Sequence, residues 1–215
     1  MGLFMWMAGV VGGREDSVVD ALRGYAMEND MLLDVVGAAS ADEATLTIST
    51  GAGGVTILFP DELPTGSSDW EGVSQYLSEK LRSPVFWFHI HDGDLWMYLL
   101  FDNGEVVDQF NPVPEYWEEL ESDELASWQG NAKGVALRVP GLVPEQIARY
   151  LVQWGDDVVD SPERKKAYPT DAFFYGDDWQ VVDFMKTLGL DYPVDDHGAP
   201  KGATYRFVCN TDGSN

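Results

Sequence analysis

Apolar and polar residues alternate most clearly over Val85–Phe110, VFWFHIHDGDLWMYLLFDNGEVVDQF. Three aromatic-rich runs are separated there by the short polar segments Asp92-Gly93-Asp94 and Asp102-Asn103-Gly104. Asp-Gly and Asn-Gly readily adopt the positive φ angles that tight hairpin turns require. The segment therefore predicts a three-stranded antiparallel meander, with His89 and His91 together on its first strand.

The chain before the meander predicts strands alternating with helices. Met1–Val11 is apolar and is expected to form a buried first strand, and apolar residues recur at helical spacing over Glu15–Met31. Ala44–Thr50 and Val55–Phe59 predict two strands, which the glycine-rich segment Gly51–Gly54 joins by a turn. These elements supply a helix and three strands ahead of the meander.

A second helix is expected to begin at Ser67-Ser68-Asp69, whose side chains can cap its first free N–H groups, and to run through Leu81. The order up to Phe110 is then strand, helix, two strands, helix and three strands. This order is typical of an α+β fold. We expect a mainly antiparallel sheet with two helices on one face and a helical C-terminal segment.

The character of the sequence changes at Asn111-Pro112-Val113-Pro114, after which it is helical and turn-rich. The elements expected there are helices at Pro114–Leu120, Asp123–Trp128, Pro144–Trp154 and Asp177–Leu188, an exposed loop at Asp156–Lys166 and a strand at Thr204–Cys209. Their bulky apolar side chains need a surface to cover. We therefore expect residues 113–215 to pack on an α+β sheet domain of residues 1–112, which makes one composite domain.

The charge of the chain restricts its partners. The 215 residues include 37 Asp plus Glu but only 13 Lys plus Arg, a formal net charge of −24. Such a field repels phosphates, so binding to nucleic acid or to an anionic membrane is disfavoured. Solubility, adaptation to high salt and recognition of a basic partner are each compatible with this charge.

The opening segment and the single cysteine indicate the cellular compartment of the protein. A secretory signal carries basic residues ahead of its apolar residues, and Met1–Val11 has none there. No apolar run reaches the roughly 18 to 20 residues that a membrane helix requires. Cys209 alone cannot form an intramolecular disulfide, which suits a reducing compartment. We expect a cytoplasmic protein.

The densest acidic patch also contains aromatic residues. Its carboxylates are Glu115, Glu118, Glu119, Glu121, Asp123 and Glu124, and Tyr116 and Trp117 lie within it. The candidate binding residues are Glu115, Tyr116, Trp117, Glu118, Glu119 and Glu121. A run of carboxylates usually forms a solvated helix face, but aromatic residues ringed by charge are typical of the centres of protein interfaces. This patch is the candidate binding surface for a basic protein partner.

A second candidate site lies on the meander. His89 and His91 are two residues apart on one strand, so their side chains point to the same face, and Asp92 and Asp94 follow in the turn. Imidazole and carboxylate together suit zinc or another transition metal. The spacing matches no common metal motif, and turn formation explains the same aspartates without a metal. We expect this face, which also carries Trp87, to be the side away from the two helices.

Two longer segments carry a resemblance. DGDLWMYLLFDNGEVVDQFNP followed by P-x-Y-W, within Asp92–Trp117, and YGDDWQVVDFM at Tyr175–Met185 resemble a group of uncharacterised bacterial proteins. The likeness runs over most of Trp70–Tyr192. It implies a bacterial cytoplasmic protein and assigns no activity, cofactor or catalytic residue.

The sequence contains no convincing catalytic motif. The leading hypothesis is a non-enzymatic, cofactor-free interaction module that binds a basic protein as an immunity-type inhibitor or adaptor. The alternative is a metal-dependent hydrolase or small-ligand-binding protein built on His89 and His91. A third hypothesis is a structural subunit that forms a homo-oligomer.

Overall fold

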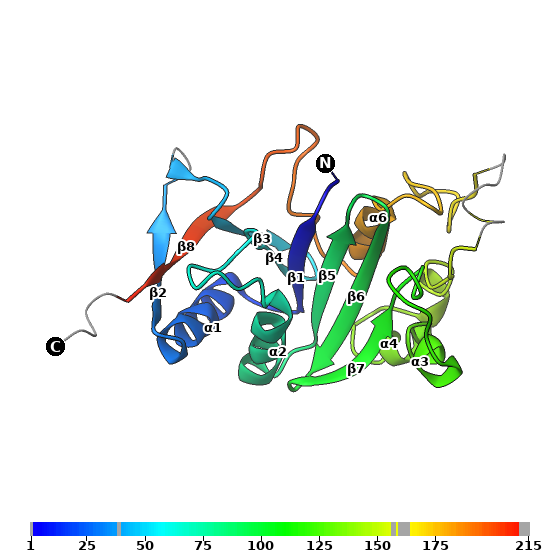
Figure 1. Ribbon diagram of the computed structural model, residues 1–215, viewed down its shortest axis with the longest axis horizontal. Helices are drawn as coiled ribbons and strands as arrows, with labels where there is room; N and C mark the ends of the chain where they lie inside the picture. Colours follow the sequence, from blue (N-terminus) through cyan, green and yellow to red (C-terminus); the bar gives the residue numbers. More distant parts are fainter. Residues whose placement is uncertain (1, 38–39, 156–157, 159–163, 211–215) are drawn as a thin grey trace.

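A computed structural model of the chain describes residues 2–37, 40–155, 158 and 164–210 (Figure 1). Within these residues eight strands form one sheet in the order β2-β8-β3-β4-β1-β5-β6-β7, and each neighbouring pair is antiparallel. The strands are β1 (Met5–Val11), β2 (Met31–Val36), β3 (Leu46–Gly51), β4 (Gly54–Leu58), β5 (Val85–His91), β6 (Leu95–Asp102), β7 (Glu105–Phe110) and β8 (Ala203–Cys209). The antiparallel sheet and its helices confirm the expected α+β fold.

Helices cover both faces of the sheet. Helices α1 (Glu15–Glu28) and α2 (Trp70–Leu81) lie side by side on one face, as expected, and α6 (Gln180–Thr187) lies on the other (Figure 1). The short helices α3 (Ser122–Ser127) and α4 (Ala132–Ala136) lie next to β7. None of the helices in the described part of the chain is long and apolar enough to cross a membrane.

The boundaries of α2 follow from its sequence. The side chain of Asp69 accepts a hydrogen bond of 2.9 Å from the backbone N–H of Gly72, which caps the first turn as expected. Arg82 ends the helix in the left-handed conformation, with a φ of 51°, and Pro84 leads into β5. The apolar side of α2 is buried through Trp70, Val73 and Leu77.

The core beneath α6 is aromatic. The ring of Phe184 in α6 lies 5.2 to 6.3 Å from the rings of Phe86, Phe88, Trp96 and Tyr98 on β5 and β6. All five side chains are fully buried. These four aromatic side chains of the meander therefore pack in the core, where cross-strand ring pairs stabilise the sheet.

The N-terminal part of the chain requires one correction. The helix expected over Glu15–Met31 ends at Glu28, because Asp30 turns the chain with a φ of 55°. Met31 then begins β2, a strand that the sequence analysis missed. The partner of β2 is β8, the strand expected over Thr204–Cys209, which inserts between β2 and β3.

The C-terminal half is less helical than expected. Pro114–Leu120 forms bends and turns, because its apolar side chains do not recur at helical spacing, and Pro144–Trp154 forms only a 3-10 turn at Pro144–Gln146. The expected helix at Asp177–Leu188 begins at Gln180, and α4 was not expected. Most of the expected loop at Asp156–Lys166 lies outside the described residues.

Candidate functional site

His89 and His91 lie on the face of the sheet that α1 and α2 cover. Successive side chains of β5 alternate between faces, and Phe86 and Phe88 contact Phe184 of α6. The histidines must therefore point to the opposite face, with Trp87. The expectation that this face is the one away from the two helices is wrong. The error arose because sequence spacing shows which residues share a face but not which helix covers it.

The two histidines are hydrogen-bonded to each other. The Nδ1 of His89 lies 3.2 Å from the backbone carbonyl oxygen of Met5, and its Nε2 lies 3.2 Å from the Nδ1 of His91. Because a carbonyl oxygen can only accept, the proton of neutral His89 is on Nδ1. The Nδ1–H of His91 then donates to the Nε2 of His89, and both ring nitrogens of His89 are occupied.

Burial keeps His89 neutral. Its side chain is 6% exposed. This loss of solvation lowers the pKa of His89 from 6.5 to about 4, which nearby His91 reinforces and the hydrogen bond to Met5 partly opposes. His89 is therefore an uncharged, fixed support for His91 at neutral pH.

Five further rings surround this pair, and together the seven form a feature that we call the ring cluster: Phe4, Trp6, Trp87, His89, His91, Tyr116 and Trp117. Trp6 and Trp87 stack on His89 with ring centroids 5.3 and 5.7 Å away. Phe4 and Trp117 meet the ring of His91 edge-on at 5.0 and 4.9 Å. Trp117 is nevertheless 52% exposed and Phe4 42% exposed, so the outer part of the cluster faces solvent.

Exposed carboxylates flank residues of the ring cluster along the chain, and we call them the acidic rim: Asp92, Asp94, Glu115, Glu118, Glu119 and Glu121. The hydroxyl of Tyr116 donates a hydrogen bond of 2.7 Å to Oδ2 of Asp94. This bond is the main reason that the pKa of Tyr116 is raised, with smaller contributions from burial and from the charges of Asp94 and Asp92. Among the described residues, Glu118, Glu119 and Glu121 form no ion pair, so their charges are available.

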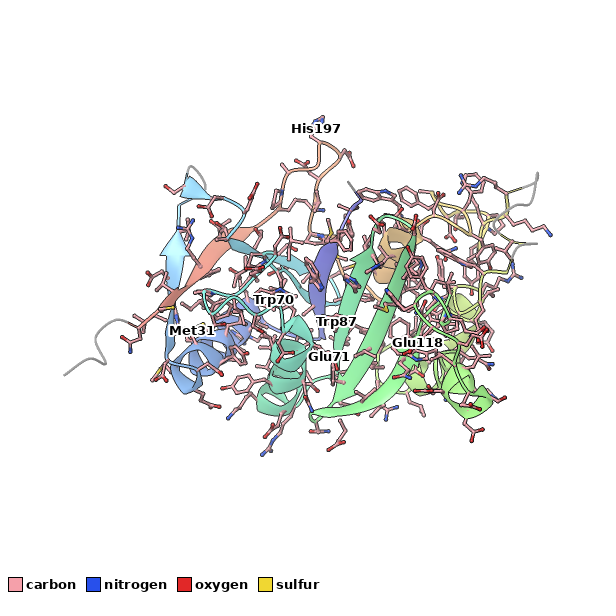
Figure 2. All side chains as sticks on the ribbon, viewed as in Figure 1. Met31, Trp70, Glu71, Trp87, Glu118 and His197 are labelled. Atoms are coloured by element: carbon pink, nitrogen blue, oxygen red, sulfur yellow. The ribbon has the colours of Figure 1, made fainter. Side chains whose placement is uncertain are left out.

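The two candidate sites of the sequence analysis meet in this region. The acidic aromatic segment packs onto the histidine strand through the contact of Trp117 with His91 and the hydrogen bond of Tyr116 with Asp94. Figure 2 shows Trp87 over the central strands and Glu118 nearer to β7, whereas His197 projects from the loop before β8.

His89 and His91 lie together, but in the described part of the chain they do not form a metal-binding group with Asp92 and Asp94. Both nitrogens of His89 are hydrogen-bonded, and Asp94 is bonded to Tyr116. In the part of the chain that the structure describes, no group of three or more His, Cys, Asp or Glu side chains is arranged to hold a metal ion. Among the described residues, the hydrogen bonds of the two histidines use both nitrogens of His89 and the Nδ1 of His91, but not the Nε2 of His91.

Three contributors were missed by the sequence analysis. Phe4 and Trp6 belong to the ring cluster, and their spacing of two residues at the start of a strand was a signal that they share a face with each other. Asp178 is buried, and this raises its pKa to about 6, with further contributions from the charges of Asp177 and Asp94.

The chain was compared with known proteins. No family model matches it, and no significant match exists among curated proteins or solved structures. The resemblance suggested by the sequence therefore stays a prediction, and the function has to be argued from the site itself.

Proposed function

We propose that this chain is an acidic cytoplasmic interaction module that binds a basic protein, as an inhibitor or adaptor, through the ring cluster and the acidic rim. The observation that carries this proposal is that Trp117 and Phe4, which both contact His91, are 52% and 42% exposed, and that the chain next to Trp117 carries exposed carboxylates without ion pairs among the described residues.

The chemistry of this surface favours a cationic side chain of the partner. Exposed Trp and Tyr rings offer an electron-rich face to a guanidinium or ammonium group, and each such contact contributes about 0.5–1 kcal/mol at an exposed site. The carboxylates of the rim then pair with neighbouring cations and, with a net charge of −24 on the chain, steer a basic protein toward the surface. Aromatic anchors surrounded by charge are the usual arrangement at interface centres.

The partner can be captured at this surface. A photo-reactive benzoylphenylalanine in place of Trp117 should crosslink to a basic protein in a lysate of the native host. The matched control is the same residue in place of Val106, which is 47% exposed on β7. Equal crosslinking from positions 117 and 106 would contradict the proposal that the partner binds at the ring cluster.

The captured partner then allows a kinetic test with two charge-matched triple variants. Glu118→Gln, Glu119→Gln and Glu121→Gln together should slow association about tenfold at low salt and reduce its salt dependence. Asp34→Asn, Glu43→Gln and Glu79→Gln remove the same charge from exposed positions in other elements and should change the rate much less. Equal effects of the two triples would show that only net charge matters and would refute the proposed surface.

A further inference from the structure

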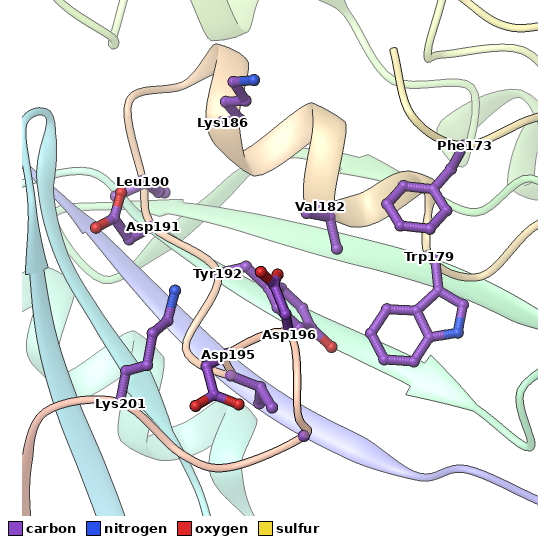
Figure 3. A pocket seen from close by; sticks show the side chains of 12 residues that line it. Phe173, Trp179, Val182, Lys186, Leu190, Asp191, Tyr192, Asp195, Asp196 and Lys201 are labelled. Atoms are coloured by element: carbon purple, nitrogen blue, oxygen red, sulfur yellow. The ribbon is translucent and has the colours of Figure 1, made fainter.

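A pocket of about 520 Å³ lies on the other face of the sheet, between α6 and residues 190–201 (Figure 3). It is separated from the ring cluster by β1, since the hydroxyl of Tyr192 in the pocket donates to the Sδ of Met5, whose carbonyl oxygen bonds His89. Its volume is within the range of about 300–1,000 Å³ that is usual for small-molecule sites.

One side of the pocket is an aromatic wall. The ring of Trp179 stacks on that of Phe173 with centroids 6.2 Å apart, and it lies 5.8 Å from the ring of Tyr192. Val182 extends this wall, and Trp179 is still 38% exposed. An indole at the N-terminal end of α6 that stays open to a pocket offers a stacking surface for an apolar or aromatic group.

The opposite side carries charges of both signs. Figure 3 shows Phe173 and Trp179 together on one side and Lys201 across from them, with Asp195 and Asp196 in between. Oδ1 of Asp195 accepts hydrogen bonds of 2.8 and 2.9 Å from the backbone N–H groups of His197 and Ala199. These two bonds fix the carboxylate in position and leave its second oxygen available.

Lys201 and Asp195 are near each other without forming an ion pair. The positive charge of Lys201 contributes to lowering the pKa of Asp195, after the two backbone hydrogen bonds, yet the two side chains do not meet in the described structure. A fixed carboxylate and a nearby ammonium group that are not paired with each other can each pair with the opposite charge of a ligand that carries both signs.

We propose that this pocket binds a zwitterionic small molecule with an α-amino-acid head group and an aromatic or large apolar side chain. The ligand ammonium pairs with Asp195 and Asp196, its carboxylate pairs with Lys201, and its side chain lies against Trp179 and Phe173. A purely anionic ligand would leave the carboxylates of the pocket unpaired, and a purely cationic ligand would leave Lys201 unpaired, which costs affinity in each case.

Calorimetric titration of the full chain with three related probes tests this proposal. L-phenylalanine carries both charges, phenethylamine lacks the carboxylate and 3-phenylpropanoate lacks the ammonium, while all three share the same ring. L-phenylalanine is expected to bind at least about tenfold more tightly than either singly charged probe, which corresponds to the loss of one charged hydrogen bond. Equal binding of phenethylamine, or no binding of any probe, would overturn the proposal.

Two variants locate the site. Lys201→Gln should weaken the binding of L-phenylalanine about tenfold and leave that of phenethylamine unchanged, because only the former presents a carboxylate to Lys201. Trp179→Ala should weaken the binding of all three probes. The matched control Lys133→Gln removes a charge from an exposed position on α4 and should have no effect. A Lys201→Gln variant that binds L-phenylalanine normally would also overturn the proposal. The pocket and the ring cluster use different residues, so either proposal can fail alone.

Discussion

His89 Nε2 lies 3.2 Å from His91 Nδ1, in a contact through which the neutral ring of His89 accepts a hydrogen bond from its neighbour. This hydrogen bond joins buried His89 to His91, whose ring contacts the exposed side chains of Phe4 and Trp117. This bond and the ring contacts with Phe4 and Trp117 fix the orientation of His91 within the chain.

The first prediction concerns pH. The pKa of His89 is about 4 in the folded chain and 6.5 in the unfolded chain, so the unfolded state binds more protons between these values. Stability contributed by His89 is therefore complete above pH 6.5 and falls as pH drops toward 4, by about 3 kcal/mol in all. Chemical denaturation at pH 5 and 7 should show about 2 kcal/mol of this loss in the wild type. His89→Phe keeps a ring between Trp6 and Trp87 and should lose less unfolding free energy between pH 7 and pH 5. An equal loss in this variant would show that a group other than His89 causes the pH dependence.

Asp178 should have the opposite effect on stability. Its pKa is raised from 3.8 to about 6, so the folded state binds more protons in that window and the contribution of this carboxyl to stability falls as pH rises through it. Asp178→Asn removes this cost and should stabilise the chain by about 2–3 kcal/mol at pH 7 but hardly at pH 3.5. The comparison is Asp34→Asn at an exposed position. If Asp34→Asn stabilises the chain equally, the stabilisation comes from the reduced net charge and not from removing the buried carboxyl of Asp178.

Phe184 should be the most sensitive position of α6. Its ring is fully buried against Phe86, Trp96 and Tyr98, so Phe184→Ala opens a cavity and should cost about 3–5 kcal/mol. Val106→Ala, at an exposed position of β7, should change the free energy of unfolding by less than about 0.5 kcal/mol. Urea denaturation measures both. Similar losses would mean that α6 is not part of the cooperative core.

Gly202 should not tolerate a side chain. A Cβ there would lie 1.9 Å from the carbonyl oxygen of Ile48, and its φ of +120° is itself unfavourable for other residues. Gly202→Ala should therefore cost about 3 kcal/mol or more. Gly141→Ala is the control, because Gly141 also has a positive φ but open space around it, and it should cost about 1–2 kcal/mol. Equal thermal shifts of the two variants would show that the clash with Ile48 is relieved.

Zinc should not stabilise the chain. Each ring nitrogen of His89 already forms a hydrogen bond, so a metal bound by His89 and His91 would have to displace the bond of His89 with Met5 or with His91. Thermal melts with and without equimolar zinc should therefore coincide. A zinc-dependent rise in Tm that His91→Gln abolishes would instead establish the metal site and favour the hydrolase alternative.

Most of the sheet was predictable because its strands carry their own local signals. Asp-Gly and Asn-Gly turns bound the strands of the meander, and Asp92 and Asn103 indeed take positive φ values of 54° and 52°. β2 was missed because Met31 continued the apolar pattern of α1, and only the reversal at Asp30 separates them. The pairing of β2 with β8 joins residues 31–36 to 204–209, which no local pattern can indicate.

The candidate site was predictable only in pieces. The carboxylates and rings of residues 115–121 and the histidines of β5 were each recognised from composition and spacing. Their convergence depends on how the chain returns after β7, where a helix was expected and bends and turns bring Trp117 back onto His91. Side chains that dock on a distant strand, rather than along a helix face, leave no periodic pattern in the sequence.

The central position of β8 also bears on how the chain folds during synthesis. β2 and β3 each have β8 as a neighbour in the sheet, so both present open edges until residues 203–209 have left the ribosome. Unpaired edges of this kind invite pairing between chains. The nascent chain should therefore depend on chaperones until translation reaches β8, with the acidity of the chain, through mutual repulsion, limiting aggregation in the interval.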